Sequence, residues 1–508
     1  MSDAAGQSER FTEGALLWPL LTLAAPLVTT QLLQTVYNLT DTFWVLRLGN
    51  DAMAALSYSW PVVFLLISVG GGMTAAGTIL VSQNTGAENE GRVNFVAGQT
   101  LGFVTLLSLG LSIAGYLLTP MLLSLLGSQP GTGVHTMAVS YTRIVFLGLW
   151  FMFGFFVFQA LLRGWGDTKT PMYLMTGSVA LNVVIDPVFI LGFTDNPLFS
   201  WLGLESLAAW LYAHTGFEGM GVAGAAIATV GSRGLAALAG FWLLFSGRVG
   251  ITPSLSALRP ELAPVRKIVR IGAPVSVEQS TQALSVTLMT VLIALVGDNA
   301  VAAYGVGGRF GTIVWLPMVG MGMAVETVVG QNLGAGRRDR ARRVVYHASA
   351  ILVAAFLVVS VVATLYARPI VGLFAGTSSG PVADHVVTFI HIVAPTYAVM
   401  GIFHMMNGAF HGAGATRLSM VLGLTTLWGF RAALAAILIT VVGLGAVGAW
   451  YGIAASNVVS TLAATVCFLH GGWLGDSLAT ADKEPATTAE ADAASDTESA
   501  AEGEGTAV

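Results

Sequence analysis

Long apolar stretches follow one another along most of the chain, and polar residues gather in the short intervals between them. Most stretches hold the about 20 residues that a helix needs to cross a bilayer. They are much longer than the alternating strands of about 10 residues in outer-membrane barrels. The pattern predicts an all-α membrane protein with twelve transmembrane helices. We place these helices at residues 14–44, 52–82, 93–118, 133–160, 170–192, 219–247, 265–294, 300–332, 343–367, 383–411, 416–441 and 446–473.

The second half of the chain repeats the first. Equivalent residues differ in number by 248, as three pairs show: Pro26 and Pro274, Gln34 and Gln282, and Gln83 and Gln331. Gly219 and Gly443 differ by only 224, which places an insertion in the first half at about residues 194–217. An even number of spans in each copy makes the copies parallel, related by an axis along the membrane normal. The repeat predicts two pseudo-symmetric six-helix bundles with a substrate path between them.

These features divide the chain into five parts. We expect an N-terminal cytoplasmic segment (1–13), a first lobe (14–247), a cytoplasmic linker (248–264), a second lobe (265–473) and a tail (474–508). The tail has nine acidic residues, one lysine and almost no large apolar residue, so we expect it to be disordered. We expect the insertion to form an extended outer loop.

Composition and charge define the surroundings of the protein. Of 508 residues, 55% are hydrophobic and 10% are charged, whereas soluble proteins have about 25% charged residues. The outer solvent must therefore be lipid, and we expect no nucleic-acid partner. Most of the 22 basic residues face one side if both termini are cytoplasmic, and the opposite loops hold little beyond Arg47 and Arg368. The positive-inside rule then predicts a multi-pass protein of the cell membrane with cytoplasmic termini.

The two halves differ most in their polar residues within the predicted spans. Asp41, Asn182, Asp186 and Thr229 of the first half correspond to Met289, Phe430, Leu434 and Ile453, and Tyr37 and Tyr141 correspond to Ser285 and Phe389. Asn182 and Asp186 are four residues apart and project from one face of a helix. Acidic groups sharing a poorly hydrated site take up a proton or hold a cation between them. Hard oxygen ligands suit Na⁺ as well as H⁺.

Two prolines adjoin this set. Pro187 cannot donate a hydrogen bond to the carbonyl of Val183, and Pro26 cannot donate to that of Thr22, so both favour a kink. A simpler interpretation places Asp41 and Asp186 near the outer surface, hydrated separately, with Arg47 as a partner of Asp41. The matching positions of the second half are apolar, which favours a functional site because acids within spans are otherwise costly.

The second half has acids of its own. Glu278 and Glu326 correspond to Thr30 and Thr78 of the first half. Arg309 is a candidate partner for either acid. A structural ion pair and a second coupling site explain these residues equally well. We therefore keep four secondary candidates: Glu278, Gln282, Arg309 and Glu326.

Other motifs carry less weight. Residues 219–224 and 443–448 both read G-x-G-x-x-G, but each copy opens an apolar helix, where small residues allow close packing rather than dinucleotide binding. The chain has no Gly-Lys-Ser/Thr phosphate loop, so ATP-driven pumping is unsupported. His404 and His411 have no acidic or cysteine companion at ligand spacing, which favours packing or substrate contact. We expect no cofactor other than the coupling ion.

The chain resembles the multidrug and toxic compound extrusion (MATE) family, and its DinF-type branch most closely. The resemblance covers residues 14–473. The motifs that carry it are Pro26 with Gln34 and Asp41, the repeated Gln83-Asn84 and Gln331-Asn332, Arg163-Gly-x-Gly-Asp-Thr-Lys-Thr-Pro171, Asn182-x-x-x-Asp-Pro187 and Gly221-Val-Ala-Gly-Ala-Ala-x-Ala-Thr229. The C-terminal half departs from the branch that places an aspartate in helix 10, because that helix reads His404-Met-Met-Asn407.

The resemblance implies a V-shaped, twelve-helix exporter that works by alternating access, driven by inward Na⁺ or H⁺. It implies small amphipathic, cationic or flavin-like substrates. The residues it implies for the cation site are Asp41, Asn182, Asp186 and Thr229, with Tyr141 nearby, and those for the bending part of helix 1 are Pro26, Gln34, Tyr37 and Trp44. We expect a functional monomer, since one chain holds both lobes.

Three other functions are weighed against efflux. A lipid-linked oligosaccharide flippase on a related fold would carry more basic residues in its central cavity, whereas here they crowd the cytoplasmic loops. A membrane-embedded enzyme would need a nucleophile and base, or a metal set, and the sequence offers neither. A channel would gain little from two pseudo-symmetric lobes. Efflux by antiport is the interpretation that the sequence favours.

Overall fold

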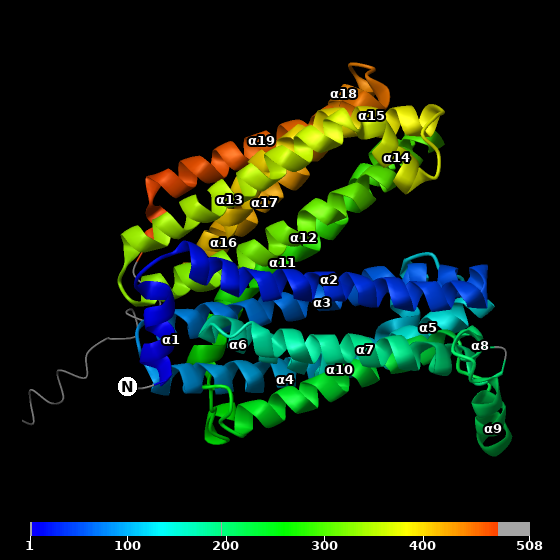
Figure 1. Cartoon of the computed structure of the whole chain (residues 1–508), viewed down its shortest axis with the longest axis horizontal. Helices are drawn as coiled ribbons and strands as arrows, with labels where there is room; N and C mark the ends of the chain where they lie inside the picture. Colours follow the sequence, from blue (N-terminus) through cyan, green and yellow to red (C-terminus); the bar gives the residue numbers. More distant parts are fainter. Residues whose placement is uncertain (1–2, 195, 476–508) are drawn as a thin grey trace, which may run out of the picture.

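The computed structural model describes residues 3–194 and 196–475. These residues form helices joined by short loops, without a strand among them, which confirms the predicted all-α fold (Figure 1). The tail from residue 476 onward, for which disorder is expected, lies outside the described residues.

Two groups of long helices form the two lobes. The first lobe contains α2 (Leu17–Val45), α3 (Asn50–Gly86), α4 (Glu90–Leu125), α5 (Gly133–Leu147), α6 (Leu149–Trp165), α7 (Lys169–Leu191) and α10 (Val222–Phe245). The second contains α11 (Leu262–Ala294), α12 (Asp298–Gly334), α13 (Arg338–Leu365), α15 (Pro381–Val393), η3 (Ala394–Thr396), α16 (Tyr397–Gly412), α17 (Thr416–Gly423), η4 (Leu424–Ala432, a π-helix), α18 (Ala433–Thr440) and α19 (Gly445–His470).

Shorter helices lie outside these spans. They are α1 (Asp3–Thr12), η1 (Leu46–Leu48), α8 (Pro197–Trp201), α9 (Glu205–Thr215), η2 (Ser256–Leu258), α14 (Ala367–Ala375) and η5 (Gly472–Leu474). The predicted insertion thus forms the two short helices α8 and α9. Tyr212 of α9 donates a hydrogen bond to Glu218 over 3.1 Å, and this bond raises the pKa of the tyrosine.

Every predicted span overlaps a helix or a consecutive run of helices. Ten spans in the described part of the chain are long and apolar enough to cross a membrane, and eleven if α5 and α6, which bend by 49° at their junction, count as one. The remaining predicted span is α11, which has 33 residues. Its polar run from Glu278 to Gln282 reduces its apolar character, which fits a helix that faces protein rather than lipid.

The start of the first helix of each lobe packs in the core of the other lobe. Leu20 and Leu23 of α2 belong to the core that α12 to α19 build. Ile268 and Ile271 of α11, their equivalents 248 residues later, belong to the core of the first lobe. The two lobes therefore exchange helix ends, and neither core is complete without the other lobe.

Two hydrogen bonds join the lobes reciprocally. The side chain of Gln83 in α3 donates to the carbonyl of Gly412 at the end of α16 over 2.8 Å. The side chain of Gln331 in α12 donates to the carbonyl of Gly164 in α6 over 3.1 Å. Each residue of the first bond has its repeat equivalent in the second, so one interaction occurs twice about the pseudo-symmetry axis.

Glycines bring the two backbones into contact at the same place. A methyl group added at Gly86 would lie 1.9 Å from the carbonyl oxygen of Gln331, and one added at Gly334 would lie 1.9 Å from that of Gln83. Residues with a side chain cannot approach so closely. The ends of α3 and α12 therefore close one end of the molecule. We call it the basic end, and it holds Arg92, Arg163, Lys169, Arg248, Arg259, Arg266, Lys267, Arg270, Arg337, Arg338, Arg340, Arg342 and Arg343.

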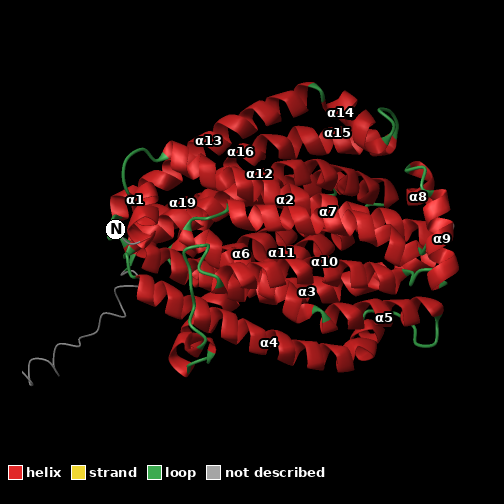
Figure 2. Ribbon diagram, turned by 60° about the horizontal axis from the view of Figure 1, so that its bottom comes forward, coloured by secondary structure: helices red, strands yellow, loops and turns green. Residues whose placement is uncertain are grey.

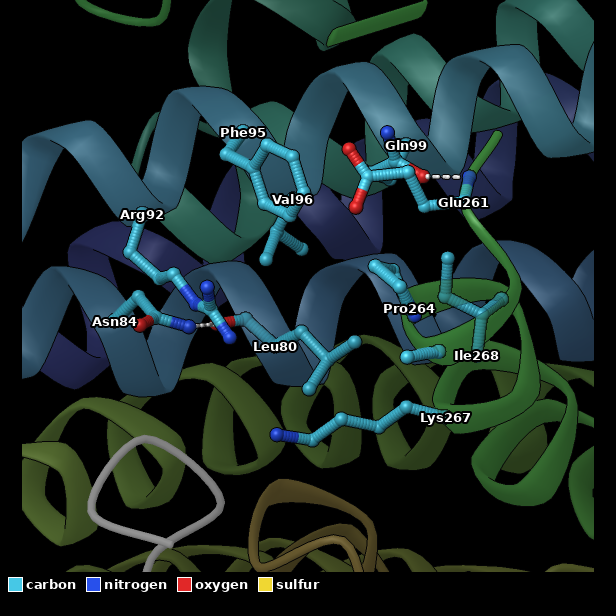
Figure 3. A pocket seen from close by; sticks show the side chains of 11 residues that line it. Leu80, Asn84, Arg92, Phe95, Val96, Gln99, Glu261, Pro264, Lys267 and Ile268 are labelled. Atoms are coloured by element: carbon cyan, nitrogen blue, oxygen red, sulfur yellow. Dashed lines mark hydrogen bonds between the residues drawn. The ribbon is translucent and has the colours of Figure 1, made fainter. Parts of the chain in front are cut away.

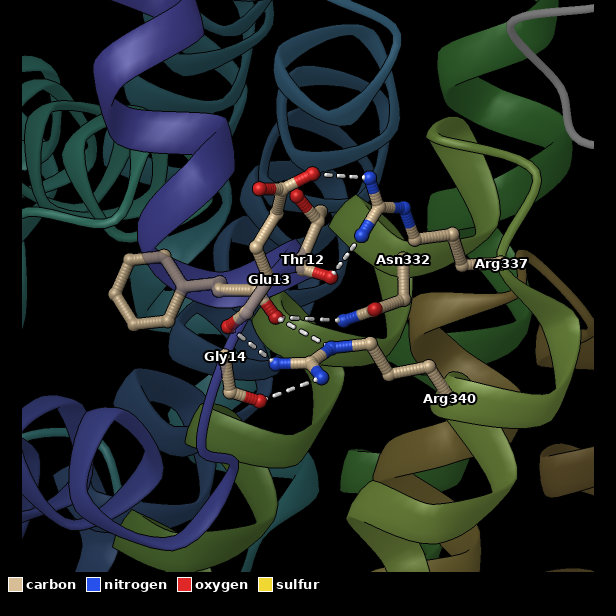
Figure 4. Close-up of polar contacts among 7 residues, drawn as sticks. Thr12, Glu13, Gly14, Asn332, Arg337 and Arg340 are labelled. Atoms are coloured by element: carbon tan, nitrogen blue, oxygen red, sulfur yellow. Dashed lines mark hydrogen bonds and ion pairs between the residues drawn. The ribbon is translucent and has the colours of Figure 1, made fainter.

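The N-terminal segment packs across this closed end (Figure 4). The carbonyl of Phe11 accepts hydrogen bonds from Asn332 over 3.2 Å and from Arg340 over 3.3 Å. Arg337 donates to the carbonyl of Thr12 and forms an ion pair with Glu13, each at 2.6 Å. The Phe11 side chain is buried and lies beside Gly166, which follows α6. α1 therefore contacts both lobes.

The lobes diverge from the basic end toward the opposite end, which gives the molecule its V shape (Figure 1). Helices α8, α9 and α14 lie at that opposite end (Figures 1 and 2). The insertion is anchored at this opposite end by aromatic contacts. Arg47 lies over the rings of Trp44 and Trp201, 5.2 and 5.0 Å from their centroids. Contacts between the lobes thus concentrate at one end of the protein.

We predict that Gly334→Ala destabilises the purified protein by about 1–3 kcal/mol, the usual cost of overpacking a tight contact. Its methyl group would collide with backbone rather than with a flexible side chain. Thermal unfolding in detergent measures the effect. Gly110→Ala is the control, because its methyl group meets nothing within 4 Å. Equal melting temperatures of the two variants would contradict the proposed contact.

Candidate functional site

Polar side chains from four helices of the first lobe gather in its interior. We call them the N-lobe polar cluster, and they are Gln34, Tyr37 and Asp41 of α2, Tyr141 of α5, Asn182 and Asp186 of α7, and Thr229, Ser232 and Arg233 of α10. The cluster forms because α2 and α10 both pack against α7, while α5 packs against α10. Asn182 and Asp186 are fully buried, and Asp41 is half-buried.

Hydrogen bonds fix one side of the cluster. The hydroxyl of Tyr37 donates to the carbonyl of Thr229 over 3.2 Å and lies 3.0 Å from the hydroxyl of Ser232. Asn182 donates its side-chain amide to Asp186 over 3.0 Å. These bonds hold α2 against α10 and fix the orientation of the Asp186 carboxylate.

The two acids of the cluster interact electrostatically. Asp41 and Asp186 come from different helices, yet they are close enough for their negative charges to repel each other. The Arg47 guanidinium lies over the ring of Phe43, 4.8 Å from its centroid, in addition to its contacts with Trp44 and Trp201. The simpler interpretation, in which Arg47 pairs with a separately hydrated Asp41, therefore does not describe the observed contacts.

Four oxygen atoms of the cluster are buried without a hydrogen-bond partner. They are Oδ1 of Asp41, Oδ1 of Asn182, Oδ2 of Asp186 and Oγ1 of Thr229. A buried polar atom without a partner costs about 1–3 kcal/mol. A small cation with oxygen ligands would relieve this cost, and a proton on either carboxylate would remove the repulsion between the two acids. The donor set thus fits both Na⁺ and H⁺ as a transported ion.

The cluster contains two residues that the sequence did not point to, Ser232 and Arg233, and Arg233 is the charged one. Arg233 lies in the middle of α10, donates to Gln34 over 2.7 Å and lies over the ring of Tyr37 at 4.8 Å. It also interacts electrostatically with Asp41. Arg233 could have been found from the sequence, because it lies in the centre of an apolar span, and charged residues at such positions usually have a function.

Two residues expected in the bending part of helix 1 lie apart from the cluster. Trp44 packs against Trp201 of α8 with ring centroids 5.6 Å apart, so it anchors the insertion. Pro26 lies inside α2, which continues as one helix through it. Its carbonyl accepts a hydrogen bond from the hydroxyl of Thr30 over 2.9 Å.

The second-lobe equivalents of Asp41, Asn182, Asp186 and Thr229 are apolar. Met289 and Ile453 are buried, and Phe430 and Leu434 are partly buried. A buried arginine occurs in this lobe too, but on another helix. Arg431 of η4 donates to Ser456 over 2.7 Å and to Asn457 over 3.0 Å. The second lobe therefore has no acid at the positions of Asp41 and Asp186.

Glu278, one of the secondary candidates, is well bonded, whereas Oε1 of Glu326 is buried without a hydrogen-bond partner. Glu278 of α11 accepts a hydrogen bond from Asn407 over 2.7 Å and lies 3.1 Å from the ring nitrogen of His411, both on α16. Asn407 in turn accepts a hydrogen bond from Ser419. Gln282 lies one helical turn further along α11 and is half-buried. Both carboxylate oxygens of Glu278 thus have partners.

The expected pairing of Arg309 with one of these acids is wrong. Arg309 is exposed on α12, and His411 and Asn407 occupy the carboxylate of Glu278. Glu326 interacts electrostatically with Arg163, which is the repeat equivalent of His411. Arg163 also donates to Thr78, the equivalent of Glu326, over 2.9 Å. These residues link the lobes near the basic end.

Comparisons with known proteins agree with this architecture. A model of the MatE family matches residues 26–188 and 274–437, two segments that begin 248 residues apart. The chain is similar to the probable multidrug resistance protein YoeA of Bacillus subtilis, with 30% identity over 442 residues, covering 86% of this chain and 90% of that protein. It is similar to the probable multidrug resistance protein NorM of Thermotoga maritima, with 25% identity over 463 residues, covering 89% and 92%.

A solved structure shows the same fold. A crystal structure of MATE in the bent conformation superposes with a TM-score of 0.80, covering 93% of this chain and 97% of that one at 23% sequence identity. Both lobes and their divergence therefore belong to a known arrangement of helices.

We predict opposite stability effects for the two acidic clusters. In Na⁺-free buffer, Asp186→Asn should keep or raise the melting temperature, because it removes a repulsion and a carboxylate oxygen without a partner. Glu278→Gln should lower it, because breaking a buried, hydrogen-bonded pair costs about 3–5 kcal/mol. Thermal unfolding in detergent compares them. If Asp186→Asn destabilises the protein as much as Glu278→Gln, the first cluster is structural and well satisfied.

Proposed function

The chain belongs to the MatE (multidrug and toxic compound extrusion) family of membrane transporters, and from this premise we propose that it exports amphipathic or cationic organic compounds in exchange for inward Na⁺ or H⁺. It is a multi-pass membrane protein and a transporter rather than an enzyme. In the proposed orientation both termini and the basic end face the cytoplasm, as the distribution of Lys and Arg favours. One chain supplies both lobes, so the working unit is a monomer.

The single observation that carries the coupling proposal is the set of four buried oxygens without partners, on Asp41, Asn182, Asp186 and Thr229. An incoming cation supplies the missing partner and neutralises the acidic pair. Removing charge from a site of low dielectric changes the electrostatic energy by several kcal/mol, which is enough to shift a conformational equilibrium. The second lobe offers no such set at the equivalent positions.

The neutralised pair acts on α2 through Arg233. This arginine interacts with Asp41 and also holds Gln34 and Tyr37, which lie on the same helix. When the charge of Asp41 is neutralised, Arg233 loses its electrostatic attraction to this residue. Its contacts with Gln34 and Tyr37 of α2 then change. α2 then bends near Pro26, the packing inside the first lobe changes, and the substrate leaves toward the outside.

Alternating access also requires that the basic end open. In the described arrangement the lobes meet there through the reciprocal hydrogen bonds of Gln83 and Gln331. We propose that these bonds form the inner gate and break when the lobes rock. A lipid-linked oligosaccharide flippase remains the runner-up, and a transport assay with an organic dye separates the two.

We predict that Asp41→Asn and Asp186→Asn each abolish ion-driven efflux of a fluorescent cationic dye from proteoliposomes. Imposing a Na⁺ gradient or a pH gradient, one at a time, identifies the coupling ion. Asp51→Asn is the control, because it neutralises an exposed acid at the start of α3. Normal gradient-driven efflux by both cluster variants would overturn the proposed cation site.

We predict that the double variant Gln83→Leu, Gln331→Leu favours the arrangement with an open basic end. Two lost hydrogen bonds of about 1 kcal/mol each shift the equilibrium by about thirtyfold. Spin-label distances between α4 and α13 at this end report the change as a longer component. Gln129→Leu, an exposed position at the opposite end, is the control. An unchanged distance distribution would exclude these glutamines as the inner gate.

A further inference from the structure

A cavity of about 250 Å³ lies at the basic end, away from the N-lobe polar cluster. Its walls come from the last turns of α3, the first turns of α4, the end of the linker and the start of α11 (Figure 3). The residues that line it are Leu80, Asn84, Arg92, Phe95, Val96, Gln99, Glu261, Ala263, Pro264, Lys267 and Ile268. The cavity thus spans both lobes and the segment that connects them.

The polar lining has a basic side, with Arg92 and Lys267, and an opposite side, with Glu261 and Gln99. Arg92 of α4 and the amino group of Lys267 lie on the side of Asn84, whereas Glu261 lies on the side of Gln99 (Figure 3). The amide of Gln99 also donates to the carbonyls of Ala257 and Arg259, over 3.0 and 2.8 Å, which fixes the linker as a wall of the cavity. The basic side brings together two positive groups, one on α4 and one at the start of α11.

The apolar lining lies next to these charges. Phe95, Val96, Leu80 and Ile268 form one continuous surface with the basic side. A ligand that fits must therefore combine a negative group with a hydrophobic portion. The cavity is smaller than the roughly 300–1,000 Å³ of pockets for drug-sized molecules. Its size suits a headgroup better than a whole transport substrate.

The linker carries two further signs of contact with lipid. Leu255 and Leu262, on either side of η2 and at the entrance to α11, are 75% and 85% exposed. Exposed leucines beside Arg259, Arg266 and Arg270 are typical of a segment at the boundary between headgroups and acyl chains. Basic pockets between transmembrane helices at such a boundary bind anionic headgroups.

We propose that this cavity binds the phosphate headgroup of an anionic phospholipid from the leaflet at the basic end. Arg92 and Lys267 hold the phosphate, and the acyl chains leave along Phe95 and Ile268. The proposed orientation makes this the cytoplasmic leaflet, but the site itself does not depend on the transport activity. A bound headgroup connects α4 with the start of α11, which packs in the core of the first lobe.

The experiment titrates delipidated full-length protein with phosphatidylglycerol or phosphatidylcholine and counts bound lipids by native mass spectrometry. The wild type should prefer phosphatidylglycerol. The double variant Arg92→Ala, Lys267→Ala should lose about 25-fold in affinity for it, from about fivefold per basic residue. Arg92→Lys with Lys267→Arg should retain binding, and melting temperatures confirm folding.

The matched control is Arg266→Ala, Arg270→Ala, which removes the same charge from the same region without touching the cavity lining. Its affinity should fall less than about threefold. Equal losses in both double variants would overturn the site in favour of a diffuse surface attraction. Displacement of the lipid by equimolar inorganic phosphate would overturn the phospholipid as ligand. Absence of phosphatidylglycerol binding to the wild type would also overturn it.

Discussion

The contact between the ends of α3 and α12 is the interaction on which the rest of the structure depends. Gln83 and Gln331 reach across to backbone carbonyls of the other lobe, and Gly86 and Gly334 let the two helices touch. Because each bond has a repeat equivalent, one sequence motif builds both halves of the contact. The same end is further fixed by α1. Lobes that meet at one end can diverge at the other, and this geometry gives the first lobe an interior in which polar groups are held at a distance from the second.

A symmetric scaffold thus carries asymmetric chemistry. The first lobe keeps oxygens without partners on Asp41 and Asp186, and the second lobe pairs Glu278 fully with His411 and Asn407. The first arrangement leaves both acids with an oxygen that has no partner, whereas both carboxylate oxygens of Glu278 are bonded. Buried polar groups that remain unsatisfied point to a missing ligand, and satisfied ones point to structure. The difference is the reason why the proposed ion site lies in the first lobe.

The sequence predicted the helices and the repeat well, because apolar length and residue offset are local properties. It also indicated which polar residues to examine, since Asp41, Asn182, Asp186 and Thr229 lack polar equivalents. It could not predict their neighbours. Arg233 enters the cluster through the packing of α10 on α7, and Arg309 proved to be exposed although its charge suggested a partner. The exchange of helix ends between the lobes could not be predicted either, because an apolar residue in the sequence does not indicate which of the two cores it joins.

That exchange has a consequence for biosynthesis. Leu20 and Leu23 leave the ribosome among the first residues, but their packing partners in α12 are made roughly 300 residues later, although domains usually fold in the order of synthesis. During synthesis the start of α2 therefore lacks its protein packing partners, and lipid or the insertion machinery covers it until α12 is made. The first lobe made alone would be an incomplete product, and quality control in the membrane has a natural target in its uncovered leucines.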